Sequence, residues 1–345
     1  MEYISIGTRR KKDGTTLDVT FQPIISDKND IEQLKEQFSI SKSGFIEISS
    51  KDYSNCRDTY FINLPSDYPK NNDYHQVDMI LFYLSNIDAS INSTEEAYFR
   101  LHLLSQRCLK PHDQCLDGLF PNLPNNAWTS IGPVLPEHVS HLQNKWTHNG
   151  HYFVVTHIDK FPYMLNYVVP SGVRVADASR VRLGAYLGHG TTIMPAGFVN
   201  FNAGTLGNAM VEGRISAGVI VGDDSDIGGG ASIMGTLSGG NNVVISIGKK
   251  CLLGANAGTG ISLGDGCTIA AGTYVYAGKK VSLFDENNNP VDINNNPVAL
   301  GQNIVKAMEL SGLNFRLYIE DSQTGELISK PNSKVIQLNE ALHKN

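Results

Sequence analysis

The sequence lacks the features that mark several classes of protein. None of its apolar runs reaches the roughly 18 residues of a membrane-spanning helix, so we expect no membrane span. The net charge is −6 and there is no long basic run, which disfavours binding to nucleic acid. Residues 1–12 contain no apolar core of a secretion signal, and the five cysteines fit no CxxC spacing. Both observations predict a cytoplasmic protein with free thiols.

Proline is scarce and glycine abundant in one segment. Of the 33 glycines, 24 lie in Ser171–Ser282, together with a single proline, Pro195. In this segment an aliphatic residue returns every six positions, with three interruptions: Val175, Val181, Leu187, Ile193, Val199, Val221, Ile227, Ile233, Ile247, Leu253, Leu263, Ile269, Val275 and Val281. A period of six fits neither a helix nor a half-buried strand. It is typical of a β-helix, in which each unit supplies one strand and one corner, so we expect these side chains to point inward.

The regions on either side of the repeat have other patterns. Before it, Ile31–Gln37 and Ser93–Gln106 are predicted helices, and Val77–Leu84 and His151–His157 are predicted strands. The longer helix has a cap at Ser93 or Thr94 and one apolar face, formed by Ala97, Leu101, Leu104 and Cys108. This pattern indicates a mixed α/β domain at the N-terminus.

After Val281 the period stops, and short β-rich segments follow. We expect strands at Val291–Ile293, Phe315–Ile319 and Lys334–Leu338, and a helix or irregular strand at Leu300–Leu310. A solenoid needs such a cap to cover its last coil. The predicted architecture is therefore an N-terminal α/β domain (1–168), a parallel β-helix (169–282) and a small β-rich cap (283–345).

The interruptions of the repeat are the places to look for chemistry. The step from Val211 to Val221 is ten residues instead of twelve, the step from Ile233 to Ile247 is fourteen, and the step from Leu253 to Leu263 is ten. All three stretches are rich in glycine, alanine and serine. Small residues let a ligand approach the backbone closely, which favours a ligand groove over plain surface loops.

Glu212 is the only acid between Asp177 and Asp223. A carboxylate can take the proton that an amine loses when it attacks an acyl group. In a strand, Arg214 would share a face with Glu212, so the alternative is a structural carboxylate paired with Arg214. His189, the single histidine of the repeat, is a second candidate base.

Long strings around these residues resemble a known family. FNAGTLGNAMVEGRIS (Phe201–Ser216), GGGASIMGTLSGG (Gly228–Gly240) and ISIGKKCLLGANAGTGISLGDG (Ile245–Gly266) are similar to tetrahydrodipicolinate N-succinyltransferase, in its longer actinobacterial and pseudomonad form. The resemblance is close over Val173–Val281. It continues into ELSG (Glu309–Gly312) and LNEALH (Leu338–His343), and it is loose in the N-terminal half.

The resemblance implies a left-handed β-helix and a homotrimer with active sites between subunits. It implies succinyl-CoA as donor and the amine of L-2-amino-6-oxopimelate, a dicarboxylate, as acceptor, in lysine and diaminopimelate biosynthesis. Glu212 is then the general base or a nucleophile that forms a transient acyl anhydride, and Arg214 binds the succinyl carboxylate. The remaining residues that the family motif places along the CoA channel are Gly229, Ser232, Ala255, Ala270, Ala271 and Gly278.

Other features limit the resemblance or leave alternatives open. Members with a metal ion on the trimer axis carry acids where this chain has Ser179 and Ala196, so no metal is predicted. Arg174, Arg180, Arg182 or a group upstream of the repeat are the candidates for binding the acceptor carboxylates. The competing functions are a hexapeptide acyltransferase with another acyl-CoA or an amino-sugar acceptor, and a solenoid without catalytic activity.

Overall fold

The computed structural model describes residues 1–61, 65–237 and 243–333. The chain divides into two compact units. Unit 1 comprises Met1–Leu109, Asp113–Pro162 and Asn166–Val168, and unit 2 comprises Lys110–His112, Tyr163–Leu165 and the chain from Val169 onward. Among the described residues, no helix combines the length and apolar character needed to cross a membrane.

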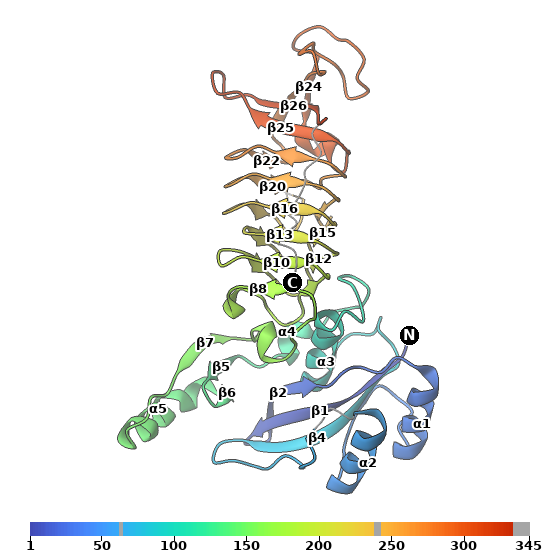
Figure 1. Ribbon diagram of the computed structural model, residues 1–345, viewed down its shortest axis with the longest axis vertical. Coiled ribbons are helices and arrows are strands. Elements are labelled where there is room, and N and C mark those ends of the chain that lie inside the picture. Colours follow the sequence, from blue (N-terminus) through green and yellow to red (C-terminus); the bar gives the residue numbers. More distant parts are fainter. Residues whose placement is uncertain (62–64, 238–242, 334–345) are drawn as a thin grey trace. The chain divides into compact units, whose positions relative to one another are not determined.

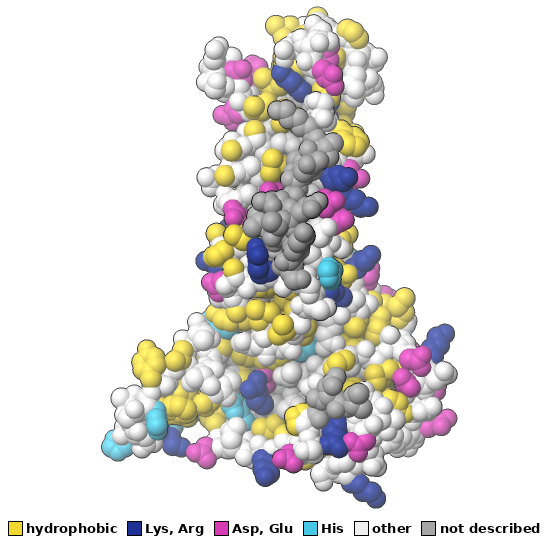
Figure 2. Space-filling model, viewed as in Figure 1, with side chains coloured by type: hydrophobic (Ala, Val, Ile, Leu, Met, Phe, Trp, Pro, Cys, Tyr) yellow, Lys and Arg dark blue, Asp and Glu magenta, His cyan; other side chains and the backbone are white. Residues whose placement is uncertain are grey.

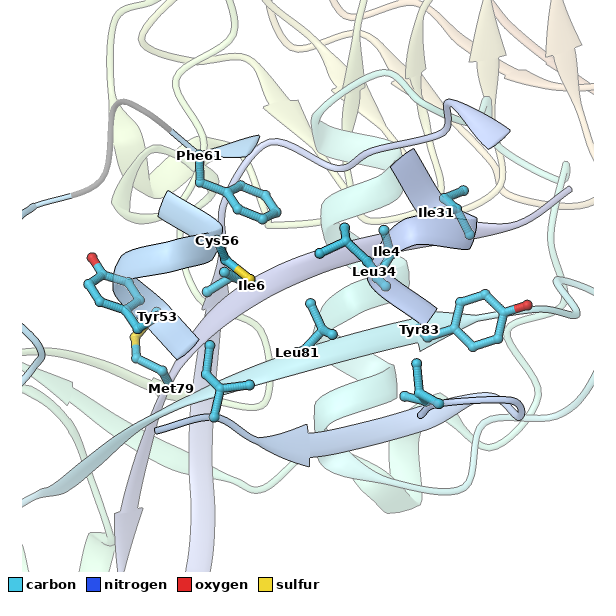
Figure 3. Packing of buried hydrophobic residues seen from close by; sticks show 12 residues of the cluster. Ile4, Ile6, Ile31, Leu34, Tyr53, Cys56, Phe61, Met79, Leu81 and Tyr83 are labelled. Atoms are coloured by element: carbon cyan, nitrogen blue, oxygen red, sulfur yellow. The ribbon is translucent and has the colours of Figure 1, made fainter. Parts of the chain in front are cut away.

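The larger sheet of unit 1 is antiparallel and has the strand order β2-β1-β4-β3. Its strands are β1 (Tyr3–Lys12), β2 (Thr15–Phe21), β3 (Gly44–Glu47) and β4 (Gln76–Leu84). Helices α1 (Lys28–Phe38) and α2 (Ser50–Tyr60) pack against it. Figure 3 shows Ile31 and Leu34 of α1 beside Ile4 and Leu81 of the sheet, all of them buried. The helix predicted at Ile31–Gln37 and the strand predicted at Val77–Leu84 are confirmed.

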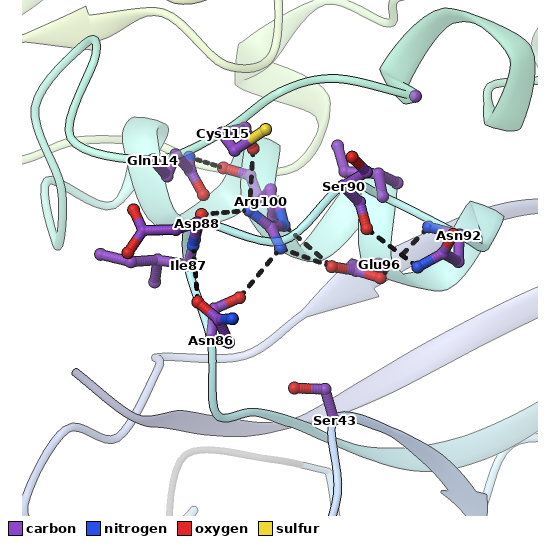
Figure 4. Close-up of polar contacts among 12 residues, drawn as sticks. Ser43, Asn86, Ile87, Asp88, Ser90, Asn92, Glu96, Arg100, Gln114 and Cys115 are labelled. Atoms are coloured by element: carbon purple, nitrogen blue, oxygen red, sulfur yellow. Dashed lines mark hydrogen bonds and ion pairs between the residues drawn. The ribbon is translucent and has the colours of Figure 1, made fainter.

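Helix α3 (Thr94–Ser105) confirms the predicted helix but not its single apolar face. Ser93 is the cap, because its hydroxyl accepts a hydrogen bond from the amide of Glu96 at 3.1 Å. All residues from Glu95 to Ser105 are buried. Phe99 stacks on Phe82 of the sheet with 4.7 Å between ring centroids, and Arg100 is buried in a network of its own (Figure 4). A helix enclosed on all sides leaves no amphipathic pattern in the sequence.

A second, three-stranded antiparallel sheet of unit 1 has the order β6-β5-β7. It consists of β5 (Asn126–Thr129), β6 (Gly132–Val134) and β7 (Val155–Asp159), and the short α4 (Leu119–Asn122) precedes it in sequence. Helix α5 (Val139–His148) supplies Leu142 to its core. The strand predicted at His151–His157 therefore begins four residues later, at Val155.

Unit 2 contains a three-sided parallel β-helix, whose stacked strands are visible in Figure 1. Face A is formed by β8 (Arg174–Val175), β10 (Thr191–Ile193), β13 (Ala209–Val211), β16 (Ser225–Ile227), β19 (Leu252–Leu253) and β21 (Thr268–Ile269). Face B is formed by β11 (Phe198–Val199), β14 (Arg214–Ile215), β17 (Ser232–Ile233), β20 (Gly258–Gly260) and β22 (Tyr274–Tyr276). Face C is formed by β9 (Tyr186–Leu187), β12 (Gly204–Thr205), β15 (Ile220–Val221) and β18 (Ser246–Ile247).

The six-residue period is confirmed as the inward-facing set of this β-helix. Every residue of the aliphatic series is buried except Val175, which is half-buried. Val175 lies on β8, the end strand of face A, where no further coil covers it. Members of the series that lie on one face, such as Ile227, Leu253 and Ile269, are in register on successive coils.

The cap follows the last coil in unit 2. It consists of β23 (Lys280–Leu283), β24 (Ile304–Lys306), a 3-10 turn at Ala307–Leu310, β25 (Arg316–Glu320) and β26 (Leu327–Pro331). The strand predicted at Phe315–Ile319 is confirmed as β25. The strand predicted at Val291–Ile293 is wrong, because Asp292 accepts hydrogen bonds from the amides of Asn294 and Asn296 and holds a turn there. The strand predicted at Lys334–Leu338 and the LNEALH string lie outside the described residues.

Candidate active site

All three interruptions of the repeat border face B. The first is the corner Glu212–Gly213 between β13 and β14, which has two residues where the equivalent corner after β16 has four, 228–231. The second, 234–245, joins β17 to β18, and its residues 238–242 lie outside the described part. The third lies between β20 and Leu263. The interruptions therefore concentrate on one side of the β-helix.

Glu212 occupies the shortened corner. Its amide and that of Gly213 both donate to the carbonyl of Ile227, at 2.8 and 3.0 Å, so the chain turns within two residues. The side chain is half-buried beside Gly229 of the next coil, where an added Cβ would lie 3.3 Å from Oε2 of Glu212. Within the described residues, the Glu212 carboxylate has no ion pair and accepts no hydrogen bond. The alternative of a carboxylate paired with Arg214 is therefore wrong for this conformation.

Arg214 is the first residue of β14 and its side chain is exposed. Its Nη2 donates a hydrogen bond to the hydroxyl of Ser232 at 2.7 Å, and the two residues are register partners of β14 and β17. The expectation that Glu212 and Arg214 share a strand face is wrong, because Glu212 lies in the corner before the strand begins. A corner redirects the chain, so the alternation rule of strands does not apply across it.

The predicted small residues stack at the same corner in successive coils. Gly229, Ala255 and the pair Ala270 and Ala271 follow β16, β19 and β21, each between face A and face B. The coils approach closely there, since an added Cβ on Gly254 would lie 2.5 Å from the amide nitrogen of Ala271. Gly278 follows β22 at the next corner, with no atom within 4 Å of an added Cβ. Gly229, Ala255, Ala270 and Ala271 thus continue, coil by coil, the edge of the β-helix on which Glu212 lies, whereas Gly278 lies on the next edge.

Tyr274 is a residue of this face that the sequence did not reveal. Gly258 lies in register between Ser232 and Tyr274, and an added Cβ on Gly258 would lie 2.0 Å from Cε2 of Tyr274. The tyrosine ring therefore fills the space that Gly258 leaves empty. We call Arg214, Ser232 and Tyr274 together the face-B strip. The sequence contained a hint of this contact, because the Gly258-Thr259-Gly260 triplet lies one coil before Tyr274 and Tyr276. Only the register of the strands shows that the Tyr274 ring lies over Gly258.

The other candidate residues are separated by their positions on the coils. His189 lies at the corner between β9 of face C and β10 of face A, away from the corner of Glu212. Arg174 is on face A, and Arg180 faces Asp177 at 3.8 Å. Arg182 lies alongside face B: its amide donates to the carbonyl of Val199 and its Nη1 donates to Oδ1 of Asn200 at 3.2 Å.

The charges on the visible surface are mixed. In Figure 2, Lys and Arg side chains lie among Asp and Glu side chains on that face of the molecule. The Ser179 hydroxyl donates to Asp177 at 2.7 Å, and this bond lowers the pKa of Asp177. The described residues contain no group of three or more His, Cys, Asp or Glu side chains placed to hold a metal ion.

Comparisons with known proteins agree on one family. A model described as "Tetrahydrodipicolinate N-succinyltransferase middle" matches residues 123–163, and one described as "Hexapeptide repeat of succinyl-transferase" matches residues 244–277. The 2,3,4,5-tetrahydropyridine-2,6-dicarboxylate N-succinyltransferase of Pseudomonas paraeruginosa is 54% identical over 256 residues, 74% of this chain and 71% of that protein. The enzyme of the same name from Vibrio cholerae is 52% identical over 268 residues, 77% of this chain and 74% of that protein. The chain belongs to the tetrahydrodipicolinate N-succinyltransferase family.

A solved structure of the same family supports the fold over nearly the whole chain. A putative 2,3,4,5-tetrahydropyridine-2-carboxylate N-succinyltransferase from Campylobacter jejuni matches with a TM-score of 0.80 and 31% identity, over 97% of this chain and 93% of that one. The match to the middle region of the N-succinyltransferase family falls on β5, β6, α5 and β7 of unit 1. The N-terminal half, where the sequence resemblance is loose, therefore also has the family's architecture.

Proposed function

We propose that this chain transfers the succinyl group of succinyl-CoA to the amine of L-2-amino-6-oxopimelate, the opened form of tetrahydrodipicolinate, in lysine and diaminopimelate biosynthesis. The relatives that are 52–54% identical carry this activity in their names. The observation that carries the assignment of the site is the Glu212 carboxylate, which is half-buried and unpaired among the described residues at the shortened corner beside the face-B strip.

In the proposed reaction, the amine nitrogen attacks the thioester carbonyl of succinyl-CoA. The N–C bond forms, the C–S bond breaks, and CoA leaves as the thiol after it takes up a proton. Glu212 accepts the proton that the amine loses, as a general base. The alternative is that Glu212 attacks the thioester first and forms an acyl anhydride, which the amine then opens. We prefer the base role, because a deprotonated amine attacks a thioester without prior acylation.

The remaining site residues have binding roles in this proposal. Arg214 binds the succinyl carboxylate by a charge-assisted hydrogen bond, with Ser232 holding its guanidinium in place. Gly229, Ala255, Ala270, Ala271 and Gly278 line the channel for CoA through their backbone groups. Arg182 is the favoured candidate for an acceptor carboxylate, because it lies alongside face B. Tyr274 forms the wall of the channel beyond Ser232.

The assembly is part of the proposal. We infer a homotrimer of left-handed β-helices with the active sites between neighbouring chains, and a division of each chain at about residues 168 and 282. The half-exposed Phe198 and Tyr274 on face B support a packed boundary there. All five cysteines are free thiols, including the buried Cys251 and Cys267, as expected in a reducing compartment, and we propose a cytoplasmic location.

The experiment is a thiol-release assay of the purified chain. Succinyl-CoA with tetrahydrodipicolinate should release CoA, and acetyl-CoA should do so much more slowly. Glu212→Gln should retain the fold and oligomeric state and lose at least about 100-fold in kcat. Failure of wild-type protein to release CoA with this acceptor rejects the reaction, and release with an amino-sugar acceptor instead supports the rival acyltransferase.

The order of the kinetics distinguishes the two roles of Glu212. A general base requires both substrates in a ternary complex, so double-reciprocal plots for the two substrates should intersect. An acyl anhydride requires that CoA leave before the amine reacts, which gives parallel lines and a burst of CoA release. Near-normal turnover of Glu212→Gln removes Glu212 from the mechanism in either form.

A further inference from the structure

Three arginines are more than nine-tenths buried, and two of them have carboxylate partners. Arg9, 4% exposed, binds Asp78 at 2.9 Å and Glu95 at 3.1 Å. Arg100, 0% exposed, binds Glu96 at 2.6 Å and donates to the backbone carbonyls of Asn86, Ile87 and Cys115 (Figure 4). Both therefore follow the rule that a buried charge is paired and hydrogen-bonded.

Arg316, on β25 of the cap, does not follow this rule. It is 8% exposed, and its Nε donates to the hydroxyl of Ser329 at 3.0 Å. Its Nη2 is buried without a hydrogen-bond partner, and no carboxylate of the described residues forms an ion pair with it. Burial lowers the pKa of Arg316, yet an arginine keeps its proton in proteins, so the positive charge must be compensated.

A second unpartnered donor lies two residues away on the same strand. Tyr318 is 0% exposed and its hydroxyl is also buried without a partner. Residues two apart on a strand point to the same side, and Arg316 and Tyr318 both point into the β-helix. Burial raises the pKa of Tyr318, so the hydroxyl stays protonated and supplies a donor instead of a negative charge.

The positions of Arg316 and Tyr318 in the cap explain why their side chains are enclosed. Tyr318 is the register partner of Ile269 and stands at the end of an aliphatic column that includes Leu253. Strand β26 pairs with β25 on the other side, and its Ser329 faces Tyr318. The apolar interior of the β-helix thus ends in a polar layer that has three donors, one positive charge and no acid among the described residues.

We propose that Arg316 and Tyr318 form a binding site for a small monovalent anion such as chloride inside the cap. An anion between Nη2 and the tyrosine hydroxyl accepts both unused hydrogen bonds and neutralises the guanidinium. Its binding to the folded chain alone stabilises the cap in proportion to the logarithm of its concentration. The site is separate from the Glu212 corner and does not depend on the proposed reaction.

The test is thermal unfolding of the full chain at constant ionic strength, with sodium chloride exchanged for sodium gluconate. Wild-type Tm should rise by about 1 to 3 °C for each tenfold increase in chloride above the dissociation constant. Arg316→Met should abolish this slope and Tyr318→Phe should reduce it. The matched control Arg180→Met removes an exposed arginine and should keep the wild-type slope. A chloride slope equal in wild type and Arg316→Met overturns the proposal, as does the absence of any slope in wild type.

Two further measurements exclude other sources of the counter-charge. Cys267→Ala should keep the chloride slope. A slope that is absent in wild type and gained in Cys267→Ala would identify the neighbouring thiol, whose Sγ lies 3.5 Å from the Arg316 amide nitrogen, as the counter-charge instead. A Tm that depends on protein concentration and not on chloride would identify a carboxylate of another chain. If Arg316→Met does not fold, wild-type crystals in sodium bromide decide the matter: an anomalous peak within hydrogen-bond distance of Nη2 supports the site, and its absence rejects it.

Discussion

The guanidinium of Arg214 donates to the hydroxyl of Ser232 at 2.7 Å, from one coil of the β-helix to the next. This bond fixes one end of a side chain that is otherwise exposed. A long arginine held in one conformation loses less entropy when it binds a carboxylate. In the proposed reaction, this pair combines the group that binds the succinyl carboxylate with the residue that positions it.

We predict that Arg214→Met raises KM for succinyl-CoA by about 10- to 100-fold, because a charge-assisted hydrogen bond to the succinyl carboxylate is lost. The KM for acetyl-CoA, which has no such carboxylate, should change little. Ser232→Ala removes only the positioning bond, and the expected effect is about five-fold. Equal effects of Arg214→Met on both donors would contradict a role in succinyl recognition.

Substitutions of Tyr274 and Gly258 should have the same effect on the KM for succinyl-CoA. If Tyr274 forms a wall of the CoA channel as proposed, Tyr274→Ala should raise KM for succinyl-CoA several-fold with little change in kcat, whereas Tyr274→Phe keeps the ring and should resemble wild type. Gly258→Ala should reproduce the effect of Tyr274→Ala, since the new Cβ would lie 2.0 Å from Cε2 of the ring and displace it. The control Gly278→Ala, with open space around its Cβ, should fold normally. Wild-type kinetics for both Gly258→Ala and Tyr274→Ala would exclude the strip from binding.

Gly204 is required for the close stacking of face C. Its φ is +155°, and an added Cβ would lie 1.7 Å from the carbonyl oxygen of Tyr186. We predict that Gly204→Ala lowers the free energy of unfolding by about 2 to 4 kcal/mol in chemical denaturation. Gly301, with a φ of +93° and no neighbour within 4 Å, is the matched control for backbone strain alone, at about 1 kcal/mol. Similar losses for the two variants would show that the contact with Tyr186 is relieved easily.

His102 should make unit 1 less stable in mild acid. It is fully buried in α3, its Nε2 accepts from the amide of Phe21 at 3.2 Å, and burial lowers its pKa from 6.5 to about 4. At pH 7 both the folded and the unfolded states are neutral at this residue. As the pH falls from about 6.5 to about 4 the unfolded state takes up the proton first, so up to about 3 kcal/mol of stability is lost.

The measurement is chemical denaturation between pH 7 and pH 4. His102→Gln, which removes the titrating ring, should flatten the loss of stability in this window even if it lowers stability at pH 7. The exposed His189 provides the control, and His189→Gln should leave the pH dependence unchanged. A wild-type stability that does not change between pH 6.5 and pH 4 would contradict a neutral buried His102.

The amino-acid sequence alone determined the β-helix. The β-helix is the regular structure that turns one side chain inward every six residues. The members of the aliphatic series from Val181 to Val281 are all buried as expected. The sequence also located the interruptions and the candidate base Glu212, because a missing pair of residues is visible in the spacing. It predicted α3 from its cap at Ser93, since capping depends on neighbours within one turn.

Only the tertiary structure decided which residues meet. Glu212 and Arg214 are two residues apart in sequence, yet the corner between them removes the strand alternation that would relate them. Ser232 and Tyr274 join Arg214 through the register of the coils, although they lie 18 and 60 residues after it along the chain. The two-residue corner at Glu212–Gly213 and the other two interruptions set this register. Neither secondary-structure propensity nor the six-residue period predicts which residues of different coils are paired. The charge of Arg316, which has no carboxylate partner among the described residues, is of the same kind, because only the positions of neighbours in space show whether a side chain is paired.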